Sequence, residues 1–67
     1  MTTQQIVEAV EQFTTERSES PTFDDIVAVF QSQGVVVDFG DLQDQLEMAV
    51  SARYLEYDNG KYSLPRG

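Results

Sequence analysis

The chain has 67 residues, a length that suits one domain, so we treat residues 1–67 as a single domain. It contains no cysteine and no histidine, which excludes a disulfide framework, zinc-finger spacing and catalysis by either residue type. Twelve acidic residues face four Lys and Arg, giving a formal net charge of −8. Such a surface repels nucleic acid, because binding to phosphate depends on clustered cations.

Two explanations of this acidity remain open. Acidic, lysine-poor surfaces are typical of proteins from salt-adapted cells, and a single lysine with more Val than Leu and Ile together fits that habit. Alternatively, the acidity serves a basic partner. The apolar runs are far shorter than the roughly 20 residues of a membrane span, and the first residues lack the basic start of a signal peptide. We therefore expect a cytoplasmic protein that does not enter a membrane.

A first helix is predicted over residues 2–18. Thr2 and Gln5 have the three-residue spacing of a capping box. Apolar residues then recur at helical spacing, namely Ile6, Ala9, Val10 and Phe13. The helix should end before Pro21, because a proline disfavours helical geometry in the residue that precedes it.

A second helix is predicted within residues 21–34. Thr22 and Asp25 again form a box-like pair, and Gly34 suits the left-handed position that follows a helix. One apolar stripe consists of Phe23, Ile26, Val27 and Phe30. Ala28 and Val29 widen this surface, so the helix is either buried on two sides or open to a partner. We expect central burial in so small a domain.

A third helix follows a short β-prone run at residues 35–37, which predicts a brief strand or an extended turn. Asp38 is the expected cap, with Asp41 as its box-like partner. The predicted core stripe is Phe39, Leu42, Leu46, Ala49 and Val50, continued by the stem of Arg53. At about 100° per residue, the opposite face presents Asp41, Asp44, Glu47 and Met48.

A hairpin is predicted at the end of the chain, because Asn59-Gly60 is a strong signal for a two-residue type I′ turn. The resulting register pairs Asp58 with Lys61, Tyr57 with Tyr62, Glu56 with Ser63 and Leu55 with Leu64. Apolar residues then meet apolar residues across the strands, and the one close charge pair is of opposite sign. We expect Tyr57 and Tyr62 on the buried face.

This order of elements resembles the winged-helix family of helix-turn-helix domains. The resemblance rests on "PTFDDIVAVFQSQG" as the second helix, "DFGDLQDQLEMAVSARY" as the third and "YLEYDNGKYSLP" as the wing. It implies an α+β fold, a three-helix winged-helix-like domain with a C-terminal β-hairpin, here in an acidic version that is halophilic if the first explanation of the acidity holds. In DNA-binding members of that family, the third helix supplies base contacts and the wing supplies phosphate contacts.

The resemblance also assigns candidate sites. The outward positions of the third helix form a candidate partner-binding surface of Asp41, Asp44, Gln45, Glu47 and Met48, with Gln43 at its edge. The candidate nucleic-acid contacts are Arg53 at the base of the wing, Lys61 in it and Arg66 beyond it. Because no cation flanks the acidic face, DNA binding by the usual mode is disfavoured.

Three functional hypotheses follow. The first is a module that acts by protein–protein contact in a regulatory assembly of transcription or replication. The second is a DNA-binding regulator from a salt-adapted organism, and the third is an acidic inhibitor of viral or mobile-element origin that imitates DNA. We expect no enzymatic activity, cofactor or metal, since capping and solvation explain the neighbouring carboxylates. A homodimer remains open.

Overall fold

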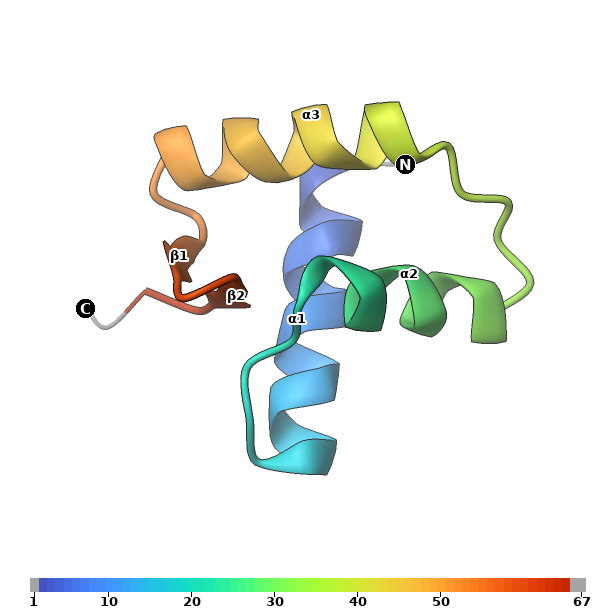
Figure 1. Ribbon diagram of the computed structural model, residues 1–67, viewed down its shortest axis with the longest axis horizontal. Coiled ribbons are helices and arrows are strands. Elements are labelled where there is room, and N and C mark those ends of the chain that lie inside the picture. The colour runs from blue at the N-terminus through green and yellow to red at the C-terminus, as the bar shows by residue number, and fades with distance from the viewer. Residues whose placement is uncertain (1, 66–67) are drawn as a thin grey trace.

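The computed structural model describes residues 2–65 and has an α+β architecture. Three helices come first: α1 (Thr3–Arg17), α2 (Phe23–Ser32) and α3 (Phe39–Ser51). An antiparallel hairpin follows, formed by β1 (Glu56–Asp58) and β2 (Lys61–Ser63). In Figure 1, α2 and α3 lie across α1, and the hairpin lies below the C-terminal end of α3. This arrangement is consistent with a winged-helix-like fold, as predicted.

The start of α1 is held by the predicted capping box. The Thr2 hydroxyl accepts from the Gln5 backbone N–H at 3.2 Å, and the Gln5 side chain accepts from the Thr2 N–H at 2.9 Å. These two bonds satisfy donors that a helix start otherwise leaves unpaired. The helix ends at Arg17, and the capping residue Ser18 adopts a left-handed conformation with φ of 56°, three residues before Pro21.

Both ends of α2 also match the prediction. Thr22 and Asp25 form a reciprocal capping box with bonds of 3.0 and 3.2 Å. After the helix, Gly34 has φ of 79°, and its N–H together with that of Val35 donates to the last carbonyls of the helix. The expected central burial is wrong for Ala28, which is exposed, whereas Val29 is half-buried against the core.

The connection from α2 to α3 forms no strand, so residues 35–37 are the extended alternative of the prediction. Val36 is 96% exposed. Asp38 caps α3 by accepting from the Asp41 N–H at 3.1 Å, as predicted. The prediction that Phe39 belongs to the core is wrong. Phe39 lies in the first turn of α3, where it is 58% exposed and its ring makes a T-shaped pair with the ring of Phe23.

The C-terminal end of α3 differs from the prediction as well. The helix stops at Ser51, and Arg53 has a left-handed φ of 66°. The N–H groups of Arg53 and Tyr54 donate to the Val50 and Ala49 carbonyls, which closes the helix end. The chain therefore leaves the helix axis before Arg53, and its exposed side chain does not continue the buried stripe.

The hairpin has the predicted register in its three described pairs: Glu56 with Ser63, Tyr57 with Tyr62 and Asp58 with Lys61. Asn59 and Gly60 both have positive φ, as a type I′ turn requires. The fourth expected pair, Leu55 with Leu64, lies just outside the strands. Both tyrosines were expected on a buried face. The expectation is wrong for Tyr57, which is 56% exposed, whereas Tyr62 is half-buried.

A further contact holds the hairpin against the helices. The Tyr62 N–H donates to the Pro21 carbonyl at 2.8 Å, and Thr22 forms an isolated antiparallel bridge with Lys61. The connection between α1 and α2 is therefore bonded to β2 at one point, beside the two-stranded sheet. Because these bonds join segments far apart in the sequence, they fix the position of the hairpin relative to α2.

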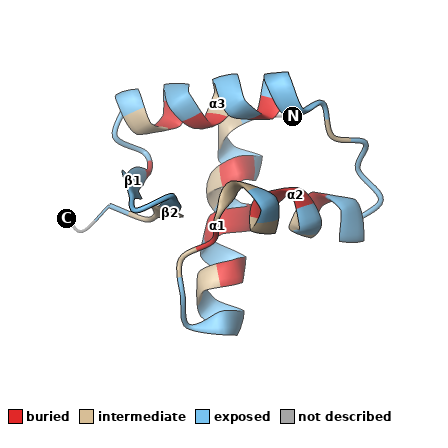
Figure 2. Cartoon of the chain, viewed as in Figure 1, coloured by how far each residue is buried: buried red, intermediate tan, exposed pale blue. Residues whose placement is uncertain are grey.

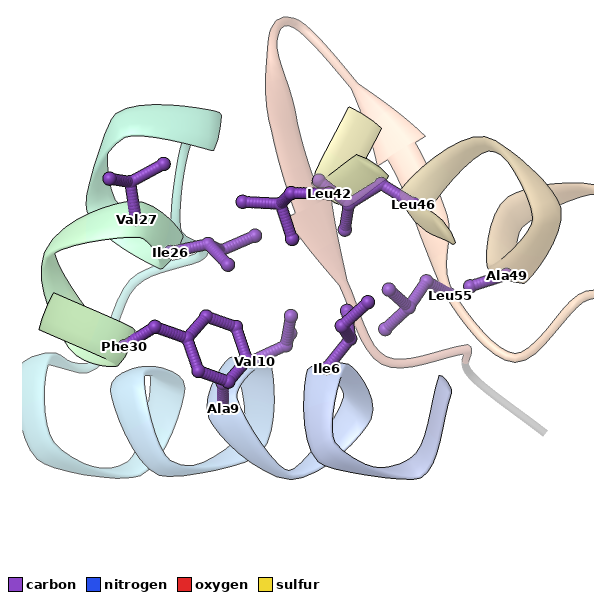
Figure 3. Close-up of a cluster of buried hydrophobic side chains, with 10 residues drawn as sticks. All are labelled: Ile6, Ala9, Val10, Ile26, Val27, Phe30, Leu42, Leu46, Ala49 and Leu55. Atoms are coloured by element: carbon purple, nitrogen blue, oxygen red, sulfur yellow. The ribbon is translucent and has the colours of Figure 1, made fainter. Parts of the chain in front are cut away.

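The core lies where the three helices and the start of the hairpin meet. Figure 3 shows its ten buried side chains pointing toward one another from all three helices and from Leu55. In Figure 2 the buried residues of α3 lie on the side turned toward the other elements. They are Leu42, Leu46 and Ala49, so this spacing decides which side of α3 remains outside.

Candidate functional site

The exposed face of α3 carries most of the predicted partner-binding residues. Asp41, Asp44, Glu47 and Met48 are all exposed, as the helical spacing predicts. Met48 is 60% exposed, although it is a large apolar side chain. The sequence of α3, Phe39–Ser51, contains three carboxylates and no Lys or Arg, so the whole helix is negatively charged.

Three of these residues line one shallow hollow. Asp44, Glu47 and Met48 lie around it together with Ser51 and Ala52 at the C-terminal end of α3. Carboxylates accept hydrogen bonds from donors and attract cations, and a thioether side chain adapts to apolar surfaces of different shape. Asp41 lies about one turn earlier, outside this hollow, where its N–H takes part in the cap of the helix. We call these four residues the acidic face of α3.

Gln45 does not belong to the acidic face, contrary to the prediction. It is half-buried, and its side-chain oxygen accepts a hydrogen bond of 3.3 Å from the Thr3 hydroxyl of α1. The sequence contained a signal for this position. Gln45 follows Leu42 by three residues and precedes Ala49 by four, so it lies on the same side of the helix as the core.

A second depression lies between α3 and the hairpin, and we call it the α3–hairpin groove. It is lined by Gln43, Glu47, Val50, Ser51, Tyr57 and Tyr62. The Tyr57 and Tyr62 rings are 4.9 Å apart between centroids and inclined at 52°. Burial, followed by the nearby Tyr57 and Glu47, raises the pKa of the Tyr62 hydroxyl above its usual value.

The sequence did not predict this groove, because Tyr57 was expected on the buried face of the hairpin. The two tyrosines form a cross-strand pair and therefore lie on the same side of the hairpin. That side borders the groove opposite α3, where Tyr62 is half-buried against the core and Tyr57 is 56% exposed. Glu47 and Ser51 line both the groove and the hollow on the acidic face, so the two surfaces are continuous.

The predicted nucleic-acid contacts are distributed over separate segments. Arg53 is exposed in the connection after α3, and Lys61 is exposed at the start of β2, where it pairs with Asp58 across the hairpin. Arg66 lies outside the described residues. Neither Arg53 nor Lys61 lines the hollow or the groove, so these two cations lie outside both surfaces next to the acidic face of α3.

Within residues 2–65, no group of three or more Asp or Glu side chains is arranged to hold a metal ion. None of the described helices is long and apolar enough to cross a membrane.

Comparisons with known proteins complete the description of the site. No protein-family model, curated protein or solved structure matches this chain. The site is therefore defined by its own geometry: a negatively charged helix face with one exposed methionine, joined to a tyrosine-lined groove.

Proposed function

We propose that this chain is a winged-helix-like module that acts by protein–protein contact in a regulatory assembly of transcription or replication. The observation that carries the proposal is the acidic face of α3, where Met48 stands exposed among carboxylates. The family interpretation and the regulatory setting come from the order of the elements. A cytoplasmic location and the lack of enzymatic activity belong to the same proposal.

Electrostatics favours a protein partner over DNA on this face. Duplex DNA carries one negative charge per about 1.7 Å of its axis, so a helix with three carboxylates and no cation is repelled from the groove. A protein surface with Lys or Arg around an apolar patch is complementary to the same face. Met48 then supplies an apolar side chain that becomes buried on binding, and the carboxylates favour a partner whose surface carries Lys or Arg.

The test is capture of a partner from a lysate of the native host by the immobilised chain, followed by identification of the bound protein. Wild type and Val36→Asp should retain the same partner, whereas Met48→Asp should lose it. Both variants place one new carboxylate at an exposed apolar position, but Val36 lies in the connection between α2 and α3. Loss in both variants, or in neither, contradicts the proposed surface.

The alternative functions give different results in the same set of measurements. A DNA-binding regulator should shift duplex DNA in a salt-dependent manner and lose that shift on Lys61→Ala. The proposed module should not shift DNA at about 0.1 M salt or at molar salt. An inhibitor that imitates DNA should compete with DNA for a basic protein, and neutral variants of Asp41 and Asp44 should weaken it.

A further inference from the structure

The α3–hairpin groove is lined by side chains from two elements, α3 and the hairpin. From α3 it receives Gln43, Glu47, Val50 and Ser51, whose spacing of three and four residues places them along one side of the helix. From the hairpin it receives the cross-strand pair of Tyr57 and Tyr62. The lining is therefore part aliphatic, part aromatic and part acidic.

One part of the groove lining is packed against the core, and the other part is exposed to solvent. Val50 and Tyr62 are half-buried and lie against the core, so their positions are set by the fold. Tyr57 is 56% exposed, and its ring lies 4.9 Å from that of Tyr62. Glu47 is exposed on the side of α3, close enough to Tyr62 that its charge contributes to the raised pKa of that hydroxyl. An aromatic ring and a carboxylate therefore border the same opening.

These groups are complementary to a cation on an apolar stem. The face of an aromatic ring attracts a cation, and guanidinium stacks on such rings more often than ammonium does. A carboxylate at the rim supplies the opposite charge and two acceptor oxygens, which match the paired donors of a guanidinium. Among residues 2–65, the lining of the groove contains one carboxylate and neither Lys nor Arg.

We propose that the α3–hairpin groove binds an arginine side chain of the partner protein, between the ring of Tyr57 and the carboxylate of Glu47. This inference rests on the proposed function, because it specifies the partner that the acidic face of α3 recognises. Since Glu47 and Ser51 line both surfaces, one basic segment of a partner reaches the groove and Met48 together.

The experiment is an NMR titration of the full chain with a short capped peptide of glycine and alanine that carries one central arginine. A second peptide replaces arginine by citrulline, which keeps the shape and removes the charge. At about 0.1 M salt, where screening extends over roughly 10 Å, the arginine peptide should shift the Tyr57, Tyr62 and Glu47 resonances in a saturable manner. The citrulline peptide should bind roughly tenfold more weakly or not at all.

Matched variants locate the binding. Glu47→Gln and Asp44→Asn each remove one carboxylate from α3, but only Glu47 lines the groove. Tyr57→Thr and Tyr54→Thr each remove one exposed tyrosine ring, and only Tyr57 lines the groove. We expect Glu47→Gln and Tyr57→Thr to weaken arginine binding at least about fivefold, with the other two variants near wild type. Unchanged methyl resonances of Leu55 and Leu64 verify that the hairpin of each variant is folded.

Several outcomes overturn the inference: no saturable shift, equal shifts with both peptides, or equal weakening by Asp44→Asn and Glu47→Gln. The proposed function fails separately, if Met48→Asp and Val36→Asp retain the same partner from the lysate. A different result is that Met48→Asp loses the partner while Tyr57→Thr and Glu47→Gln retain it fully. That result supports the acidic face as the contact surface and contradicts arginine recognition in the groove.

Discussion

The two sides of α3 differ in almost every property although they share one backbone. One side presents Leu42, Leu46 and Ala49, none of which is accessible to solvent. The other presents Asp44, Glu47 and Met48, all of them exposed. The first side contributes to stability through burial, whereas the second contributes little to it and is free to specify a partner. The outward side of α3 can therefore change its chemistry without any change in the packing of the helix.

The largest expected effect is on the buried side. Leu46→Ala removes three carbon atoms from a fully buried position and leaves a cavity that its neighbours fill only in part. We expect the free energy of unfolding to fall by about 2–5 kcal/mol, measured by urea unfolding followed by circular dichroism. In a chain of 67 residues, a loss of this size removes much of the total stability.

The matched control for that change lies on the other side of the helix. Met48→Ala truncates a side chain of similar size, and we expect the free energy of unfolding to change by less than about 0.5 kcal/mol. Similar losses for Leu46→Ala and Met48→Ala would show that Met48 is covered in solution, for instance by a second copy of the chain. That result would remove the contrast between the two sides.

A smaller effect on the free energy of unfolding is expected at the N-terminal cap of α3, which supports both sides of the helix. Asp38→Ala deletes the carboxylate that accepts from the Asp41 N–H and faces the positive end of the helix dipole. The cost should be about 0.5–2 kcal/mol in the free energy of unfolding, measured by the same urea titration. Asp38→Asn keeps an acceptor and should recover most of the loss. If the asparagine variant is as unstable as the alanine variant, charge rather than capping holds the helix start.

Local rules predicted much of this fold from the sequence. The capping boxes at Thr2 and Thr22 follow from residue types three positions apart, and the hairpin register follows from Asn59-Gly60. Each of these features depends on neighbours within a few residues. The solvent position of Asp44 and Glu47 was equally predictable, because the apolar spacing of α3 assigns the opposite side to the core.

What could not be predicted depends on contacts between distant segments. Phe39 has the right angular position for the core, but it is the first residue of α3, where it pairs with the Phe23 ring and stays 58% exposed. Gln45 is held by Thr3 of α1, and the hairpin is held by Pro21. The exposure of Tyr57 depends on how the hairpin is placed relative to the helices, which no local pattern specifies. The groove was missed for this reason.

The smallest expected effect concerns Tyr62, where the groove meets the core. Its pKa is raised in the folded state, chiefly by burial, so the folded chain keeps this proton above the usual tyrosine value of about 10. The contribution of this raised pKa to the free energy of unfolding is fully present below that pH and is lost as the pH rises through the pKa of the folded state. Urea unfolding between about pH 9 and pH 11 should therefore show a decline that Tyr62→Phe reduces. Glu47→Gln should lower the pKa of Tyr62 toward its usual value in an NMR titration, because one of the charges that raises it is removed. An unchanged pKa in that variant would mean that Glu47 does not face the ring, and the acidic rim of the groove would then be absent.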